Sequence, residues 1–146
     1  MVDSAGIEKI ISWFPDLSHN YFRVTSPCDG DYNCIAWAAG ENDRWWWPQT
    51  AYWPDNVPEE ITLAAFISAY QTLGYELCDN DRLDPGFNKV AIYLFDNGRP
   101  SHAARQLANG NWTSKLGNGW DIEHTLEGLV GQEYGHVRQI LKREKK

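Results

Sequence analysis

Cys34 and His102 are the residues whose types and placement are best suited to nucleophilic catalysis. Cys34 opens an apolar, Ala-rich segment that Gly40 ends, so a short buried helix is expected to start at or just before Cys34. A helix N-terminus lowers the pKa of a thiol, and the unpaired N–H groups of the first turn can bind an oxyanion. His102 begins a predicted strand, where an imidazole can accept the thiol proton. The two residues predict a cysteine nucleophile with a histidine base; a small buried cysteine is the structural alternative.

A third group is expected to orient His102, and the sequence offers several. Pairing of the next strand places Thr113 and Lys115 on the face of His102, or Ser114 if the turn adds a bulge. A hydroxyl accepts a hydrogen bond from imidazole weakly, and Lys115 cannot accept one. Asp121 is the better orienter, although a turn or cap role suits it equally well. A dyad without a third group also remains open.

A second oxyanion donor is expected from Asn33, beside the nucleophile, or from Tyr21, upstream of it. Asn33 is more simply explained as the helix cap.

The stretch 41–58 is a long loop that carries Trp45, Trp46 and Trp47. Long loops inside one domain are usually functional or packed on themselves. Two compatible interpretations follow: the tryptophans form a wall of the substrate cleft, because Trp stacks on flat groups, or they form a hydrophobic lid over the helices.

The order of the expected elements indicates an α+β fold, because helices come first and an antiparallel meander follows. Residues 134–141 fit a strand or a helix equally well. The expected helices cover 5–14, 34–39 and 58–73, and the expected strands cover 89–95, 101–107 and 112–116.

Length and composition exclude several classes of function. The 146 residues fit a single domain, 1–146, with 142–146 as a frayed tail. The net charge of −7 argues against a nucleic-acid partner, and no apolar run is long enough for a membrane span. Three cysteines without paired spacing argue against zinc or a disulfide framework, and no Gly-rich phosphate loop is present, so no cofactor is expected. The expected compartment is the cytoplasm, with non-classical export left open and the oligomeric state undetermined.

Three strings carry a resemblance to known sequences. Residues 32–38 (YNCIAWA), 102–107 (HAARQL) and 112–117 (WTSKLG) resemble a family of uncharacterised bacterial proteins. The order of elements is similar to the NlpC-type and CHAP-type branch of the papain-like cysteine hydrolases. This resemblance implies N-terminal helices packed on a small antiparallel sheet. The chain departs from that branch in lacking His, Asn or Gln on the strand after His102.

The resemblance implies a hydrolase or acyl transferase that acts on an amide or ester bond. Cys34 would attack the carbonyl, and His102 would take the thiol proton and return it to the leaving group. The expected partner is a peptide, a protein or an amide-containing small molecule. The competing hypothesis is a catalytically inactive papain-like module that binds a partner through the Trp-rich loop.

Overall fold

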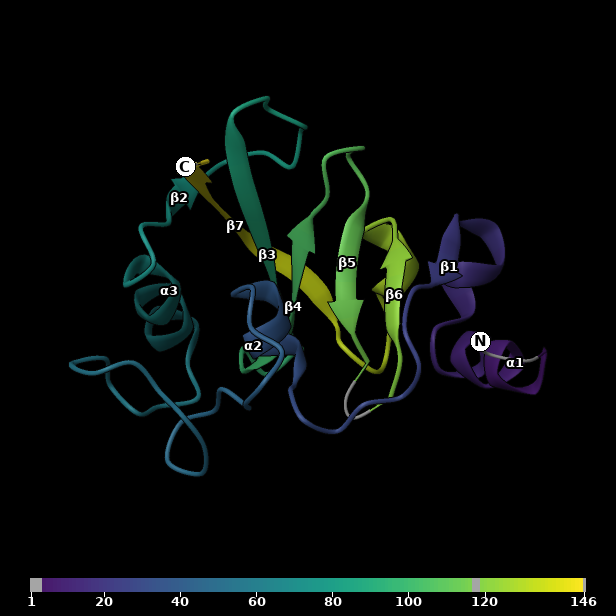
Figure 1. Cartoon of the computed structure of the whole chain (residues 1–146), viewed down its shortest axis with the longest axis horizontal. Coiled ribbons are helices and arrows are strands. Elements are labelled where there is room, and N and C mark those ends of the chain that lie inside the picture. Colours follow the sequence, from purple (N-terminus) through teal and green to yellow (C-terminus); the bar gives the residue numbers. More distant parts are fainter. Residues whose placement is uncertain (1–3, 117–118, 146) are drawn as a thin grey trace.

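One antiparallel sheet of seven strands organises the chain (Figure 1). The computed structural model describes residues 4–116 and 119–145. The strand order across the sheet is β1-β6-β5-β4-β3-β7-β2, which confirms the expected α+β class. The strands are β1 (Phe22–Val24), β2 (Glu76–Cys78), β3 (Phe87–Leu94), β4 (Pro100–Gln106), β5 (Trp112–Lys115), β6 (Asp121–His124) and β7 (His136–Glu144). The helices are α1 (Ser4–Trp13), α2 (Cys34–Ala38) and α3 (Leu63–Gln71), with 3₁₀ turns η1 (Pro15–His19) and η2 (Glu127–Leu129).

The strands β3 to β5 form the expected meander, and β6, which was not predicted, extends it. Gly98 and Gly110 have φ of 86° and 91° in the turns that join β3 to β4 and β4 to β5, a conformation that glycine adopts without strain. β7 then returns to pair with β3, which decides that the segment left open by the sequence is a strand. The predicted frayed tail is wrong for 142–144, because Lys142, Arg143 and Glu144 pair with β3.

The two faces of the sheet carry different layers. In Figure 1, α2 lies in front of β4, with α3 to one side. On that face, α2, α3 and the Trp-rich loop pack over buried residues that include Ile92 and Ala103. α1 and the two 3₁₀ turns pack on the opposite face, against Tyr93 and Ala104. In the described part of the chain, no helix has the length and apolarity needed to cross a membrane.

Polar caps define where α2 and α3 begin. The Asn33 Oδ1 accepts a hydrogen bond from the N–H of Ala36 at 3.1 Å, so α2 starts at Cys34 as predicted. The Thr62 hydroxyl caps α3 in the same way, by accepting from Ala65. The helix therefore starts four to five residues later than predicted, because the Thr62 cap defines its first turn and Pro58 does not.

Asn33 also connects α2 to the Trp-rich loop. Its Oδ1 accepts from the Trp46 N–H at 3.1 Å, and its Nδ2 donates to the Trp46 carbonyl at 2.8 Å. Trp46 is only 1% exposed, so this one amide holds both the helix and the loop at the core.

Replacement of Asn33 by Ala should therefore destabilise the protein more than the loss of an ordinary cap. We expect Asn33→Ala to lower the free energy of unfolding by about 2–4 kcal/mol, because the cap is lost and two buried backbone groups of Trp46 lose their partner. Thr62→Ala, which removes a cap alone, should cost about 1 kcal/mol. Urea denaturation of both variants tests this, and equal losses would contradict a linking role for Asn33.

Candidate functional site

Cys34 lies at the start of α2, but its thiol is buried. The sulfur is packed among core residues, and burial raises the pKa of Cys34 to about 11. Backbone hydrogen bonds from Ala103, Ile35 and Cys34 itself oppose this effect without reversing it. Only about one thiol in 10⁴ is ionised at pH 7 with such a pKa. The helix N-terminus is present as predicted, but the reactive thiolate is not favoured.

His102 lies on the other face of the sheet. His102 pairs with Tyr93, and the next residue, Ala103, pairs with Ile92. Ala103 and Ile92 share a core cluster with Cys34, whereas His102 stacks on Tyr134 at 3.9 Å between ring centroids and meets the Tyr93 ring edge-on. Successive side chains of a strand point to opposite faces. The predicted pairing of Cys34 with His102 is therefore not formed, because α2 packs over Ala103 and not over its neighbour.

His102 belongs instead to a buried polar chain across three strands. Its Nε2 lies 2.8 Å from the Ser114 hydroxyl, and that hydroxyl lies 2.6 Å from Nε2 of His124. Ser114 thus lies on the same face as His102, as expected for the case in which the turn adds a bulge. Thr113 and Lys115 point to the α2 face.

The proton positions in this row of hydrogen-bonded side chains follow from the contact that His124 makes with a backbone carbonyl. Nδ1 of His124 is 2.7 Å from the Thr125 carbonyl, so it carries the proton, and neutral His124 must accept at Nε2. Ser114 then donates to His124 and accepts from His102, which leaves Nδ1 of His102 as a bare acceptor. That atom is buried and has no partner among the described residues. Burial lowers the pKa of His124 to about 4 and that of His102 well below its usual range, in the latter case with help from His124.

The two proposed oxyanion donors are not placed for that role. The side chain of Asn33 is committed to Ala36 and Trp46, which confirms its simpler interpretation as a cap. Tyr21 is exposed and directly precedes β1, three strands away from β4.

The three adjacent tryptophans form mainly a lid. Trp46 stacks on Tyr70, and Trp47 meets Phe66 edge-on, so both complete the core over α3. Trp45 is 41% exposed, and its indole donates to the Gly30 carbonyl at 2.8 Å. The hydrophobic-lid interpretation therefore describes these residues better than a cleft wall does.

A cleft of about 470 Å³ opens on the α2 face of the sheet, over β4, β5 and β6. We call it the α2 cleft. Arg23, Thr25, Ser26, Tyr32, Trp37, Asn42, Arg105, Leu107, Thr113, Asp121 and Glu123 line it.

Asp121 is only 3% exposed, and its carboxylate lies at the floor of this cleft. Oδ2 accepts a hydrogen bond from the Tyr32 hydroxyl at 2.5 Å. Burial and the carboxylate both raise the pKa of Tyr32, so the phenol stays a donor. Oδ1 of Asp121 is buried and has no partner among residues 4–116 and 119–145. Because buried acceptors are normally satisfied, this oxygen marks a place where a ligand donor or a water is expected.

Aromatic and polar groups complete the walls of the α2 cleft. The Trp37 ring packs on Tyr32 at 5.3 Å, and its indole donates to the Thr113 hydroxyl at 3.0 Å. Glu123 accepts from Arg23 and from two asparagines of the β4–β5 turn, Asn109 and Asn111. These bonds lower its pKa, with those from the asparagines the largest causes.

Sequence reasoning named Asp121 but missed Tyr32, Trp37 and Arg105. None of these three residues carried a local signal for the cleft, because its walls come from separate segments that meet only in the folded chain.

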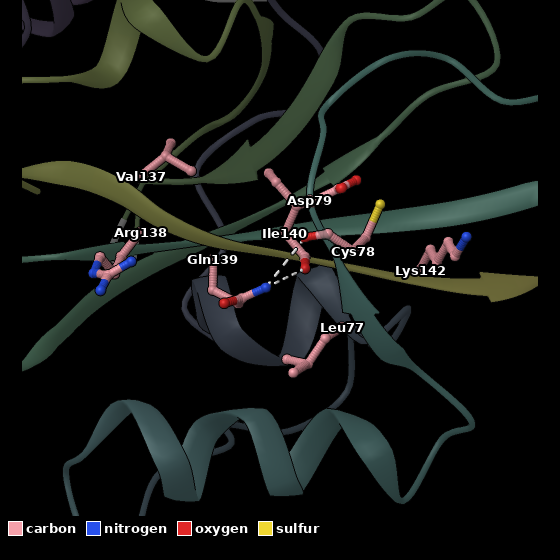
Figure 2. A pocket seen from close by; sticks show the side chains of 8 residues that line it. All are labelled: Leu77, Cys78, Asp79, Val137, Arg138, Gln139, Ile140 and Lys142. Atoms are coloured by element: carbon pink, nitrogen blue, oxygen red, sulfur yellow. Dashed lines mark hydrogen bonds between the residues drawn. The ribbon is translucent and has the colours of Figure 1, made fainter.

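A second hollow of about 570 Å³ lies beside β2 and β7, at the opposite edge of the sheet (Figure 2). One of its polar side chains, Gln139, donates to the carbonyls of Cys78 and Ile140. This hollow contains none of the predicted site residues. Within the described ranges, no group of three or more His, Cys, Asp or Glu side chains is arranged to hold a metal ion.

Comparison with known proteins gives one match. A family model described as "Domain of unknown function (DUF7689)" matches residues 23–142, which include both the α2 cleft and the buried histidines. No curated protein and no solved structure matches the chain.

The buried histidines should make the protein less stable in acid. His124 has a pKa of about 4 in the folded state and about 6.5 when unfolded, so below pH 6.5 only the unfolded chain takes up the proton. Stability is complete above pH 6.5 and is lost as the pH falls toward 4. At pH 5 the loss from His124 is about 2 kcal/mol, and His102 adds to it. Urea denaturation at a series of pH values measures this loss.

His124→Gln should make the free energy of unfolding less dependent on pH over that range. His19→Gln replaces an exposed histidine and serves as the matched control, with an unchanged pH profile. If the free energy of unfolding changes with pH by the same amount in both variants, His124 is not the source of the loss of stability in acid.

Proposed function

This chain belongs to the DUF7689 family, and we propose that it is a binding domain whose α2 cleft takes a peptide or another amide-containing small molecule. The unpartnered, buried Oδ1 of Asp121 carries this proposal. An amide N–H is a donor of the kind this oxygen lacks. The Trp37 and Tyr32 rings, which are tilted by 36° to each other, offer apolar surface on which an amide or a ring can pack.

We further propose a papain-like plan of the NlpC or CHAP type, adapted to binding. Support comes from a helix that begins at a cysteine and packs on an antiparallel sheet, against strand β4, which carries a histidine. The cysteine and histidine occupy the expected elements but opposite faces. In this proposal, the order of elements is similar to that of the NlpC-type and CHAP-type enzymes, but Cys34 and His102 do not form a catalytic pair.

The fixed groups around the cleft favour binding over catalysis. The Tyr32 hydroxyl is committed to Asp121, and the Thr113 hydroxyl accepts the indole N–H of Trp37, so the walls are held in place before a ligand arrives. A preorganised site loses less entropy on binding. The thiol of Cys34 is not among the residues that line the cleft.

Removal of the unpartnered acceptor should weaken ligand binding. N-acetylphenylalaninamide, which has two amides and an aromatic ring, is a suitable probe, and the indole N–H resonance of Trp37 reports on its binding. We expect Asp121→Asn to weaken binding about tenfold or more, because a charge-assisted hydrogen bond is lost. Asp79→Asn makes the same change at an exposed position beside β2 and should have no effect. Circular dichroism confirms that each variant is folded; binding that is equal in both variants would refute the cleft as the site.

Alkylation rates separate this function from cysteine hydrolysis. In a Cys28→Ser background, which removes the exposed thiol, iodoacetamide should label native Cys34 slowly at pH 7 and rapidly only in urea. The reason is burial together with the raised pKa of Cys34. Fast labelling that His102→Ala abolishes would instead favour the hydrolase that the sequence predicts.

A further inference from the structure

Two arginines on the α2 face of the sheet have no carboxylate within salt-bridge distance among the described residues. Arg105 on β4 and Arg143 on β7 are both partly buried. Among the described residues, neither guanidinium is within salt-bridge distance of an Asp or Glu. Partly buried charges are normally paired, and the chain carries an excess of acidic residues to pair with them. Unpaired guanidinium groups in an acidic protein therefore need an explanation.

Strand register brings the two arginines to the same region. Arg105 pairs with Val90, and Val90 pairs on its other side with Leu141. Arg143 follows Leu141 by two residues and so shares its face. Strands lie about 4.8 Å apart and residues rise about 3.3 Å along a strand, so two strand spacings and an offset of two residues place the two residues about 12 Å apart across β3. Long side chains that lean toward each other can close that distance around one small ion.

Each guanidinium is held in place by neutral groups. Arg143 donates to the Leu73 carbonyl at 2.9 Å and lies 4.7 Å from the centre of the Tyr75 ring. Arg105 lies 5.4 Å from the centre of the Trp37 ring, and its Nε is 3.5 Å from the Trp37 carbonyl. Backbone carbonyls and rings orient these cations but leave most of their N–H donors available.

Tyr75 contacts Arg143, and the charges of both arginines act on its phenol. Burial raises its pKa, and the charges of Arg143 and Arg105 partly oppose this, so the phenol remains protonated at neutral pH. Burial also lowers the pKa of Arg105; Tyr75 and the Asp121 carboxylate oppose this shift, and the charge of Arg143 adds to it. The two guanidinium groups thus repel each other, and an anion between them would relieve that repulsion.

We propose that Arg105 and Arg143 form a subsite for a carboxylate group, with the Tyr75 hydroxyl as a further donor. A guanidinium matches the planar, two-oxygen geometry of a carboxylate. A singly charged anion is favoured over phosphate, because the net charge of −7 opposes a dianion more strongly.

This subsite deepens the proposed binding function and rests on it, because Arg105 also lines the α2 cleft. A ligand that reaches both ends would offer an N–H donor to Asp121 and a carboxylate to Arg105. The class of ligand is then a short peptide or acylated amino acid with a free carboxyl end.

A matched pair of probes tests the subsite. N-acetylglycylglycine carries a carboxylate, and its C-terminal amide is the same molecule without the charge. In the ¹⁵N-labelled protein, we expect the acid to shift the side-chain Nε–H resonances of Arg105 and Arg143, and the amide to leave them unchanged. Arg105→Gln and Arg143→Gln should each weaken binding of the acid about tenfold or more. Arg138→Gln removes an exposed arginine on β7 and should leave binding of the acid unchanged.

Other outcomes overturn the inference. A carboxylate subsite would be refuted if the acid and the amide shifted the Nε–H resonances equally. It would also be refuted if Arg138→Gln weakened binding of the acid as much as Arg105→Gln and Arg143→Gln do. Tighter binding of inorganic phosphate at matched ionic strength would replace it with a phosphate site. If Arg105→Gln does not fold, Arg105→Lys keeps the charge without the forked geometry and should still weaken binding of the acid.

N-acetylphenylalaninamide distinguishes the two failures. Binding of that neutral probe without any effect of a carboxylate removes the subsite and keeps the proposed function. If neither probe binds, both proposals fail.

Discussion

The packing of α2 over Ala103 is the contact on which the arrangement of the site depends. Ala103 is small, so the helix that starts at Cys34 can approach β4 closely, and the sulfur comes within hydrogen-bond range of the Ala103 N–H. Alternation along β4 then places His102 and Ala104 on the far face. A single choice of face thereby separates the cysteine from the histidine and opens the α2 cleft over β4, β5 and β6.

The two faces of the sheet differ in the polar groups that they carry. On the far face, His102, Ser114 and His124 form a fully buried hydrogen-bonded chain that ends at a backbone carbonyl, and Nδ1 of His102 has no partner among the described residues. Such a chain fixes the register of three strands and stays neutral, because charge is costly in the core. On the α2 face, charged groups at the cleft remain incompletely paired among the described residues: Oδ1 of Asp121 lacks a donor, and Arg105 lacks a carboxylate within salt-bridge distance. The charged groups beside a cleft support a binding role for the α2 face, and the neutral buried chain supports a structural role for the far face.

Local signals in the sequence predicted much of the framework. The Ala-rich segment capped by Asn33 predicted α2, and the Asn97-Gly98 and Asn109-Gly110 turns predicted the hairpins of the meander. β1, β2 and β6 were missed because each has only three or four residues and depends on pairing with distant segments. The C-terminal segment could not be assigned from its pattern, because β3 supplies the hydrogen bonds that make it a strand.

Local sequence patterns predicted which element would carry each chemically distinctive residue: Cys34 at a helix start, His102 in a strand, and Asp121 after a loop. These predictions follow from propensity, capping and turn chemistry, which act over a few residues. Which of these residues meet depends on tertiary packing. The face of β4 that α2 covers depends on a one-residue choice of register among segments far apart in sequence, and a change of one residue reverses every side chain of a strand. Tertiary packing therefore separated Cys34 from His102 and brought Asp121, Tyr32, Trp37 and Arg105 to one cleft.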